Sequence, residues 1–318
     1  MVISNKLKQR FCKDCKIPIS VYDEPYFSDR LELYDKFYRS KEKWNVFLKE
    51  LEKYNCEQDY FEEYNRVKDT AINAIKESEG FSKFNSENMN NFSVKYTNLP
   101  SKDIYKESNV GKLFISIDMK KANFSALQHY DSNIFGGSQT WEDFIGEYTN
   151  NKHIINSKYI RQVVLGNCNP RRQVTYEKYL MGEVLSHIEK YNLKDKVVFF
   201  SNDEIVFDMS EDNVELKLLL YMCKCLQEDI NEDLNIPCRV ELFKLLNIKG
   251  TVGYLKEVIK NIDEREYKIK CLNNYMLPFV LRKLQNQEIT ENDKVFIHEG
   301  LLSKFIEVPE IEVNNIEC

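Results

Sequence analysis

Three acidic residues at the ends of predicted strands could hold divalent metal ions. Asp118 follows an apolar run at 112–117, and Asp203 and Glu204 lie in the turn between two further apolar runs. Two neighbouring carboxylates repel each other, and one takes up a proton unless cations lie between them. Magnesium prefers oxygen ligands and is often held by one or two carboxylates together with substrate phosphates. Two such ions promote nucleotidyl transfer, because they activate the attacking hydroxyl and stabilise the leaving pyrophosphate. We therefore expect two Mg²⁺ ions, with Mn²⁺ as an alternative, on Asp118 and Asp203.

A regular alternation of strands and helices would bring these carboxylates together. The expected strands cover 112–117, 196–200, 204–209 and 238–246, and the expected helices cover 121–130, 140–147, 173–191 and 213–230. Their order indicates a split βαβ arrangement, in which four antiparallel strands carry helices on one face. The first strand of that arrangement lies beside the central hairpin. The predicted fold class is thus α+β, with a βαββαβ core at 111–246 and the two aspartates as neighbours on the open face.

The region before this core, residues 1–110, is predicted to be helical. Ser40 could cap a helix, and a second run at 58–77 has its apolar residues at helical spacing. On that run, Tyr60, Tyr64, Val67 and Ala71 fall on one stripe. The polar, Asn- and Ser-rich stretch at 84–101 is typical of a loop or linker.

The region after the core, residues 247–318, is predicted to contain one hairpin and two helices. Lys249 and Gly250 have the composition of a hairpin turn. The helices are expected at 272–286 and 291–306. Together with the core, this gives three regions along the chain.

Composition excludes a generally basic nucleic-acid-binding protein. The net charge is −6, so any contact with nucleic acid must come from a local basic patch or from bridging metal ions. No apolar run reaches the roughly 18 residues of a membrane helix. The first residues lack the apolar segment of a secretory signal, so we expect a cytoplasmic protein without a membrane partner. Cys12 and Cys15 form a lone CxxC, for which buried or idle thiols are favoured over zinc.

Three segments resemble motifs of family A DNA polymerases. Residues 117–127 (IDMKKANFSAL) resemble the first palm motif, in which a strand, an Asp and a helix follow one another. Residues 200–207 (FSNDEIVF) resemble the third motif, an Asp-Glu pair in an apolar hairpin. Residues 157–166 (SKYIRQVVLG) resemble part of the fingers helix that faces the incoming triphosphate. The resemblance covers about residues 111–210.

The resemblance implies a role for individual residues. Asp118 and Asp203 would be the metal ligands, and Glu204 would assist at the primer end. Arg161 would contact the triphosphate, and Asn123 would lie where the family filters deoxyribose from ribose. The second basic position of the fingers motif holds Ser157 instead. The resemblance also implies that residues 1–110 are thumb-like and that 131–172 form a short fingers-like insertion.

A basic cluster between the two aspartate motifs adds candidate substrate contacts. It comprises Lys152, Lys158, Arg161, Arg171 and Arg172, and it stands out in an acidic chain. Gln162 lies beside Arg161 on the same predicted helix. These side chains could bind triphosphate or backbone phosphates, or they could form a solvated helix face.

Several functions remain open at this point. The first is a minimal template-dependent polymerase, with primer–template and nucleoside triphosphates as partners. The second is a template-independent nucleotidyltransferase or nucleotide cyclase on the same core. The third is an RNA-binding βαββαβ module that stacks bases on Phe114, Phe199 and Phe207, although these residues alternate with apolar ones and are expected in the core. The fourth is a degenerate palm with a structural role.

Overall fold

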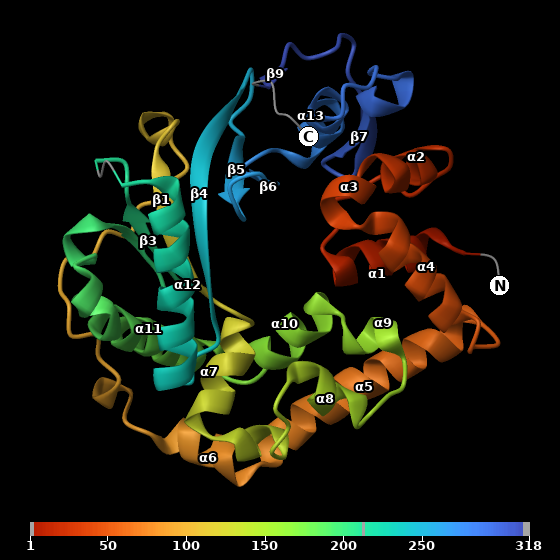
Figure 1. Cartoon of the computed structure of the whole chain (residues 1–318). Coiled ribbons are helices and arrows are strands. Elements are labelled where there is room, and N and C mark those ends of the chain that lie inside the picture. The colour runs from red at the N-terminus through yellow and green to blue at the C-terminus, as the bar shows by residue number, and fades with distance from the viewer. Residues whose placement is uncertain (1–2, 212–213, 314–318) are drawn as a thin grey trace.

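The computed structural model describes residues 3–211 and 214–313, and it is a mixed α and β structure built around an antiparallel sheet (Figure 1). Within these residues, none of the helices is long and apolar enough to cross a membrane.

The N-terminal region is helical, as predicted. Its helices are α1 (Asn5–Cys15), α2 (Tyr26–Leu33), α3 (Asp35–Tyr38), α4 (Ser40–Leu51), α5 (Glu57–Glu77) and α6 (Glu79–Ser86). The predicted stripe on α5 is buried over its full length. Ser40 is the first residue of α4 and not its cap, because its hydroxyl donates to the carbonyl of Leu31 instead.

The central sheet contains the four predicted strands and three more. Its strands are β1 (Leu113–Met119), β2 (Val197–Phe200), β3 (Glu204–Asp208), β4 (Cys238–Lys249), β5 (Tyr254–Ile259), β6 (Arg265–Lys270) and β9 (Glu312–Val313). They are ordered β2-β3-β1-β4-β5-β6, and β9 pairs with the end of β4. The predicted neighbour relation is present, since β1 lies between β3 and β4.

The two faces of the sheet bury different side chains, because residues alternate along each strand. Ile115 and Ile117 of β1 point into the main core, to which three helices of the central region, among others, contribute apolar side chains. These helices are α7 (Ala122–Tyr130), α11 (Pro170–His187) and α12 (Leu216–Asp233), and α12 packs against β4. On the other face, Phe114 and Phe243 form a smaller cluster under Ile104. The rest of that face carries polar side chains.

The insertion between α7 and α11 consists of short helices. They are α8 (Trp141–Gly146), α9 (Lys152–Ile155) and α10 (Lys158–Gly166), preceded by a 3-10 turn at Ser132–Phe135. Trp141 is fully buried and contacts Phe124 and Phe144. The insertion is therefore a packed unit that fixes α10 in front of the sheet.

The C-terminal region differs from the prediction. Residues 272–286 contain a 3-10 turn and α13 (Leu277–Leu284), which confirms a shorter helix than expected. The helix predicted at 291–306 is wrong, because β7 (Val295–His298) and β8 (Leu301–Lys304) form a hairpin there. Glu299 and Gly300 have φ values of +49° and +82°, which suit a two-residue hairpin turn and not a helix.

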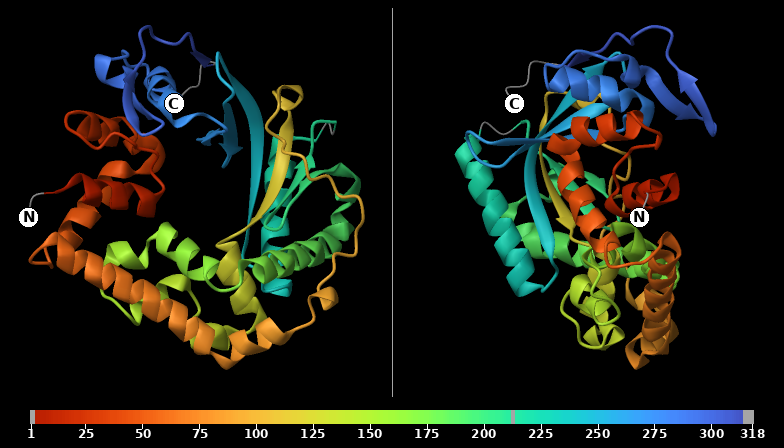
Figure 2. Two further views of the ribbon diagram at one scale, coloured as in Figure 1. Left: turned by 180° about the vertical axis from the view of Figure 1, so that it is seen from behind. Right: turned by 90° about the vertical axis from the view of Figure 1, so that its right-hand side faces the viewer.

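The N- and C-terminal regions meet on the side of the molecule away from the sheet (Figures 1 and 2). Helix α13 contacts both α2 and β9, so the chain forms a continuous circuit that starts and ends at the sheet. Helix α10 contacts α1, and α9 contacts α4. The open face of the sheet consequently faces other parts of the same chain.

Candidate active site

A row of charged side chains crosses the open face of the sheet. Asp118 lies within β1, directly opposite Glu204 of β3 and Arg239 of β4. Residues directly opposite each other on antiparallel strands project from the same face. Glu204, Asp118 and Arg239, here called the charged row, therefore lie side by side. The sequence pattern predicted Asp203 as the neighbour of Asp118. The register instead makes Glu204 the residue directly opposite Asp118.

Asp203 lies one position beyond the charged row, in the turn of the β2–β3 hairpin. Its carbonyl accepts a hydrogen bond of 2.8 Å from the amide of Met119, and its carboxylate accepts one of 3.0 Å from the hydroxyl of Ser201. Burial raises the pKa of Asp118, and the charge of Asp203 raises it further against the opposing effect of Arg239. The pKa of Glu204 is raised mainly by burial as well. These carboxyl groups are thus close enough for their charges to repel one another. An added cation would stabilise their ionised forms.

Arg239 supplies a counter-charge that the sequence analysis missed. Its guanidinium lies 2.9 Å from the carboxylate of Asp118. The side chains of Arg239 and Asp118 are 46% and 32% exposed, and such partly hydrated pairs contribute little stability. A divalent cation could therefore replace Arg239 at small cost. Alternation along β4 shows that Arg239 and Glu241 share one face. The sequence does not show which residue of β4 lies opposite Asp118, so it could not assign Arg239 to that position.

A second buried charge cluster lies beside the charged row. Glu241 of β4 accepts from Lys256 at 3.0 Å and from Lys268 at 2.6 Å. Although burial raises the pKa of Glu241, these lysines and Arg239 outweigh it and bring the pKa to about 2. Lys256 also opposes the rise in the pKa of Glu204. The cluster keeps positive charge next to the carboxylates of the site.

Glu177 of α11 is a further buried acid that sequence reasoning missed. Its two carboxylate oxygens accept hydrogen bonds from the amides of Asn123 and Asn202. Burial raises its pKa to about 7, and the nearby charge of Asp203 contributes. Asn123 thus uses its amide nitrogen within the protein, and its role toward a sugar stays a prediction. The sequence signal that could have identified Glu177 is its position on the tyrosine-rich face of the helix predicted at 173–191.

Four cations on three separate segments lie near one another, and two of them, Lys158 and Lys270, are close enough to act on the charged row. Lys158 and Arg161 lie on α10, Lys16 follows the end of α1, and Lys270 ends β6. The pKa of Lys158 is lowered first by desolvation and then by Arg161, Lys16 and Lys270, while Asp118 raises it. Lys158 is nevertheless exposed to solvent. Across 3–211 and 214–313, none of these four side chains, here called the cation cluster, forms an ion pair with a carboxylate.

Helix α10 is held in place by a buried network from the N-terminal region. Asp14 of α1 accepts from Tyr64 at 2.7 Å, from Ser157 at 2.9 Å and lies 3.0 Å from a ring nitrogen of His153. The hydroxyl of Ser157 also accepts from the amide of Ile160 and caps α10. Ser157, at the position where the resemblance led us to look for a second basic residue, therefore positions Lys158 and is itself buried.

Among the described residues, no hydrogen bond or ion pair joins the other predicted contact residues to the charged row. The guanidinium of Arg172 donates to the carbonyls of Phe84 and Glu87, so it ties α11 to the end of α6. Arg171, Gln162 and Lys152 are exposed. Their proposed contacts with phosphates stay predictions, and those of Arg172 compete with its bonds to the main chain.

The residues present suit magnesium better than a soft transition metal. Among the described residues, no group of three or more His, Cys, Asp or Glu side chains is arranged to hold a metal ion. Magnesium requires only one or two carboxylates when substrate phosphates supply further oxygens. Asp118 and Asp203 fit that pattern. Cys12 is buried, and burial raises the pKa of its neighbour Cys15 to about 12, which keeps that thiol protonated.

The aromatic residues of the sheet do not form a base-stacking surface. Phe114 and Phe207 are fully buried, as expected for core residues, and Phe199 is half-buried in the smaller cluster. Stacking on single-stranded RNA requires exposed rings. The arrangement therefore argues against the RNA-binding module.

Comparisons with known proteins give no relative for this chain. No family model matches it, and neither a curated protein nor a solved structure is significantly similar. The site must be interpreted from its own geometry.

Proposed function

We propose that this chain catalyses metal-dependent nucleotidyl transfer, and that it does so as a minimal template-dependent polymerase with a palm-like core. The observation that carries the proposal is the charge arrangement. Carboxylates on neighbouring strands lie near a cation cluster that forms no ion pair with a carboxylate within 3–211 and 214–313. A nucleoside triphosphate with its metal ions would satisfy both sides, since phosphates bind the cations and bridge through metal to the carboxylates.

The proposed reaction joins a strand-end hydroxyl to the α-phosphate of the nucleotide. The hydroxyl oxygen bonds to phosphorus, the bond to the β-phosphate oxygen breaks, and pyrophosphate leaves while the hydroxyl proton passes to solvent. Asp118 and Asp203 would hold magnesium, which lowers the pKa of the hydroxyl and neutralises the leaving group. Lys158 and Arg161 would bind the β- and γ-phosphates and hold the α-phosphate in line. Glu204 would lie at the strand end.

The test combines product analysis with single substitutions. Wild-type protein is incubated with Mg²⁺ or Mn²⁺ and labelled NTPs or dNTPs, with and without a primed template. We expect template-dependent extension, and a loss of about 100-fold or more in Asp118→Asn and Asp203→Asn. Asp208→Asn is the matched control. Asp208 lies at the end of β3 farther from Asp203, and it pairs with Lys112.

Other products would redirect the proposal. Extension without template, or cyclic products, would favour the untemplated alternative on the same carboxylates. Absence of any product from wild-type protein, with both ions and all nucleotides, would contradict nucleotidyl transfer. Thermal unfolding of each variant should stay close to that of wild type, since Asp118 and Asp203 are not in the apolar core.

A further inference from the structure

The chain forms a closed ring of contacts that begins and ends at the sheet. From β4 the circuit runs through β9 to α13, then to α2 and α4 of the N-terminal region. It continues through α1 to α10 and through α10 to α7, which follows β1 directly in sequence. Figure 1 and the left-hand view of Figure 2 show this closure. Asp118 and Arg239 of the charged row, and Lys158 and Arg161 of the cation cluster, belong to elements of this ring.

Buried ion pairs lock the ring where the two ends of the chain meet. Arg30 of α2 lies 2.9 Å from Asp293, and Arg282 of α13 lies 3.1 Å from the same carboxylate. Arg282 also lies 2.8 Å from Asp29. Asp293 is fully buried, and the side chain of Arg30 is 4% exposed. Opening the ring here would leave buried charges without partners, which is strongly unfavourable.

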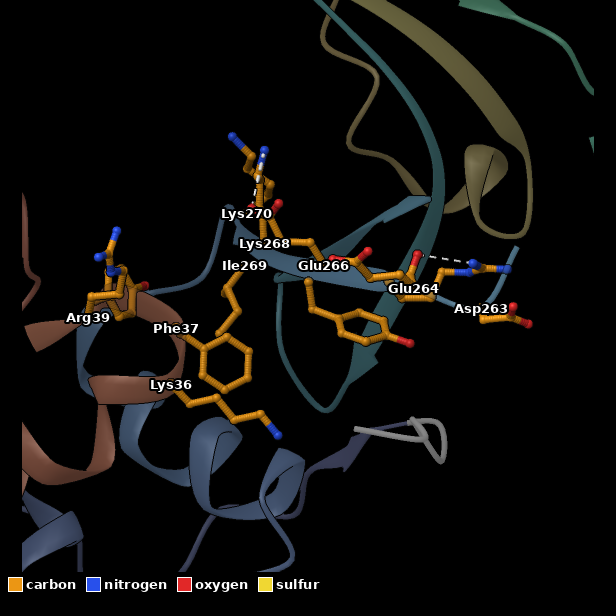
Figure 3. A pocket seen from close by; sticks show the side chains of 12 residues that line it. Lys36, Phe37, Arg39, Asp263, Glu264, Glu266, Lys268, Ile269 and Lys270 are labelled. Atoms are coloured by element: carbon orange, nitrogen blue, oxygen red, sulfur yellow. Dashed lines mark hydrogen bonds and ion pairs between the residues drawn. The ribbon is translucent and has the colours of Figure 1, made fainter. Parts of the chain in front are cut away.

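A pocket inside the ring separates α3 from the edge strand β6. Its volume is about 760 Å³, and it is lined by Lys36, Phe37, Tyr38 and Arg39 of the α3 segment and by 263–270 on the other side. Figure 3 shows Phe37 and Ile269 from the two walls, with Arg39 and Lys270 toward one end and Asp263 and Glu264 toward the other. The carboxylate of Glu266 is already paired with Lys260. Arg39 is likewise paired with Glu42, so Lys270 is the cation at that end of the pocket that forms no ion pair with a carboxylate of the described residues.

Lys270 links the pocket to the candidate active site, because it lines the pocket and also lies near Lys158 and Glu204. Cations that follow a backbone, together with aromatic rings, are typical of sites for single-stranded nucleic acid. We propose that the α3–β6 pocket binds a single strand of nucleic acid, which threads through the closed ring to reach the charged row. This inference rests on the proposed function and adds to it the path and the form of the polymer.

The dimensions favour one strand over a duplex. The pocket lies within the roughly 300–1,000 Å³ of small-ligand sites, so it holds a short segment of one strand. Because the ring is closed through the Arg30–Asp293 pair, a strand can enter by a free end but a closed circle cannot enter without ring opening. Linear and circular strands of one sequence should therefore bind very differently.

Binding is measured by competition with a labelled linear oligonucleotide in fluorescence anisotropy, using full-length protein. The competitors are an unlabelled linear strand and the covalently closed circle of the same sequence, each as DNA and as RNA. We expect the circle to compete at least about tenfold more weakly, and binding to weaken as salt rises. Equal competition by circle and linear strand would overturn threading.

Charge reversal tests the position of the strand. Lys36→Glu and Lys270→Glu should each weaken binding about tenfold, because each replaces an attraction for phosphate by a repulsion. Lys217→Glu is the matched control, since Lys217 is exposed on α12, which packs on the other face of the sheet. Equal binding by all three variants would overturn the assignment of the pocket, as would the absence of strand binding by wild-type protein.

The outcome is separable from that of the proposed function. Strand binding is measured without metal or nucleotide, and it does not require turnover. A protein that binds linear strands through the pocket but transfers no nucleotide would retain this inference and lose the polymerase. Template-dependent extension without an effect of Lys36→Glu on strand binding would retain the polymerase and overturn the assignment of the pocket.

Discussion

The carboxyl group of Glu177 shows how burial changes the chemistry of one residue. Its oxygens accept from two asparagine amides, yet loss of water raises its pKa to about 7 from an ordinary value of 4.5. The folded protein therefore keeps a proton on Glu177 at pH values where the unfolded chain has released it. Because Asn202 adjoins Asp203, the charge of Glu177 is coupled to the hairpin that carries the site.

This proton predicts a loss of stability as the pH rises. Below about pH 4.5 both states are protonated, and the contribution of Glu177 is fully present. Between that value and about pH 7 the folded state binds more protons, so the free energy of unfolding falls, by at most about 3 kcal/mol. Glu177→Gln should make urea unfolding less dependent on pH between 5 and 8. The control is Glu183→Gln, on the same helix; an unchanged slope in Glu177→Gln would contradict the assignment.

At the scale of single residues, the sequence alone could identify the carboxylates of the site but not all of the cations near them. Asp118 and Glu204 follow from strand pattern and turn chemistry, which are local signals. Lys16 and Lys270 lie far outside the region that resembles polymerase motifs, and only tertiary folding brings them to Lys158. The predicted placement of Asp203 beside Asp118 is untested as a metal site, and the register makes Glu204 the direct neighbour.

Among the structural elements, the long β4 strand depends on one glycine. Gly250 follows β4 with φ of +80°, a conformation that side chains rarely adopt. A Cβ built there would lie 2.0 Å from the carbonyl oxygen of Glu310. The close approach lets the segment before β9 pack on the turn, and so joins the C-terminal region to the sheet.

Gly250→Ala is therefore expected to destabilise the protein by more than backbone strain alone. Strain at a positive φ costs roughly 1–2 kcal/mol, and the clash with Glu310 must add to it by pushing β9 away. Gly300→Ala is the matched control, since Gly300 has φ of +82° and an added Cβ would meet nothing within 4 Å. Thermal unfolding compares the two, and equal losses would show that the approach of Glu310 is unimportant.

The elements themselves were largely predictable where periodicity was long. The α5 stripe and the strand–helix alternation of residues 113–249 were found because each pattern repeats over several turns or pairs. The stretch 291–306 was misassigned because it is short and apolar, where helix and strand patterns are hard to separate. The hairpin predicted at Lys249 and Gly250 is confirmed, since β4 and β5 pair across it, but β6 and β9 went unpredicted as parts of the main sheet because pairing partners are set by tertiary contacts.

At the scale of the whole molecule, closure of the ring depends on a small number of buried charges. Arg30 and Asp293 are separated by 263 positions in sequence, so their contact orders most of the chain. A buried pair of this kind adds less net stability than its short distance suggests, because both groups lose hydration. Its larger effect is specificity, since any arrangement without the contact leaves charges buried and unpaired.

Arg30→Met should release the N-terminal helices from the C-terminal region. We expect a loss of about 3 kcal/mol, at the lower end for a broken buried pair, because Arg282 still neutralises Asp293. The exposed pair Arg39–Glu42 provides the control, and Arg39→Ala should cost less than about 1 kcal/mol. Hydrogen exchange should show faster exchange in α2 and α13 of Arg30→Met while β1 and β3 stay protected. If exchange rose equally in all four elements, the pair would stabilise the whole fold and not the closure of the ring.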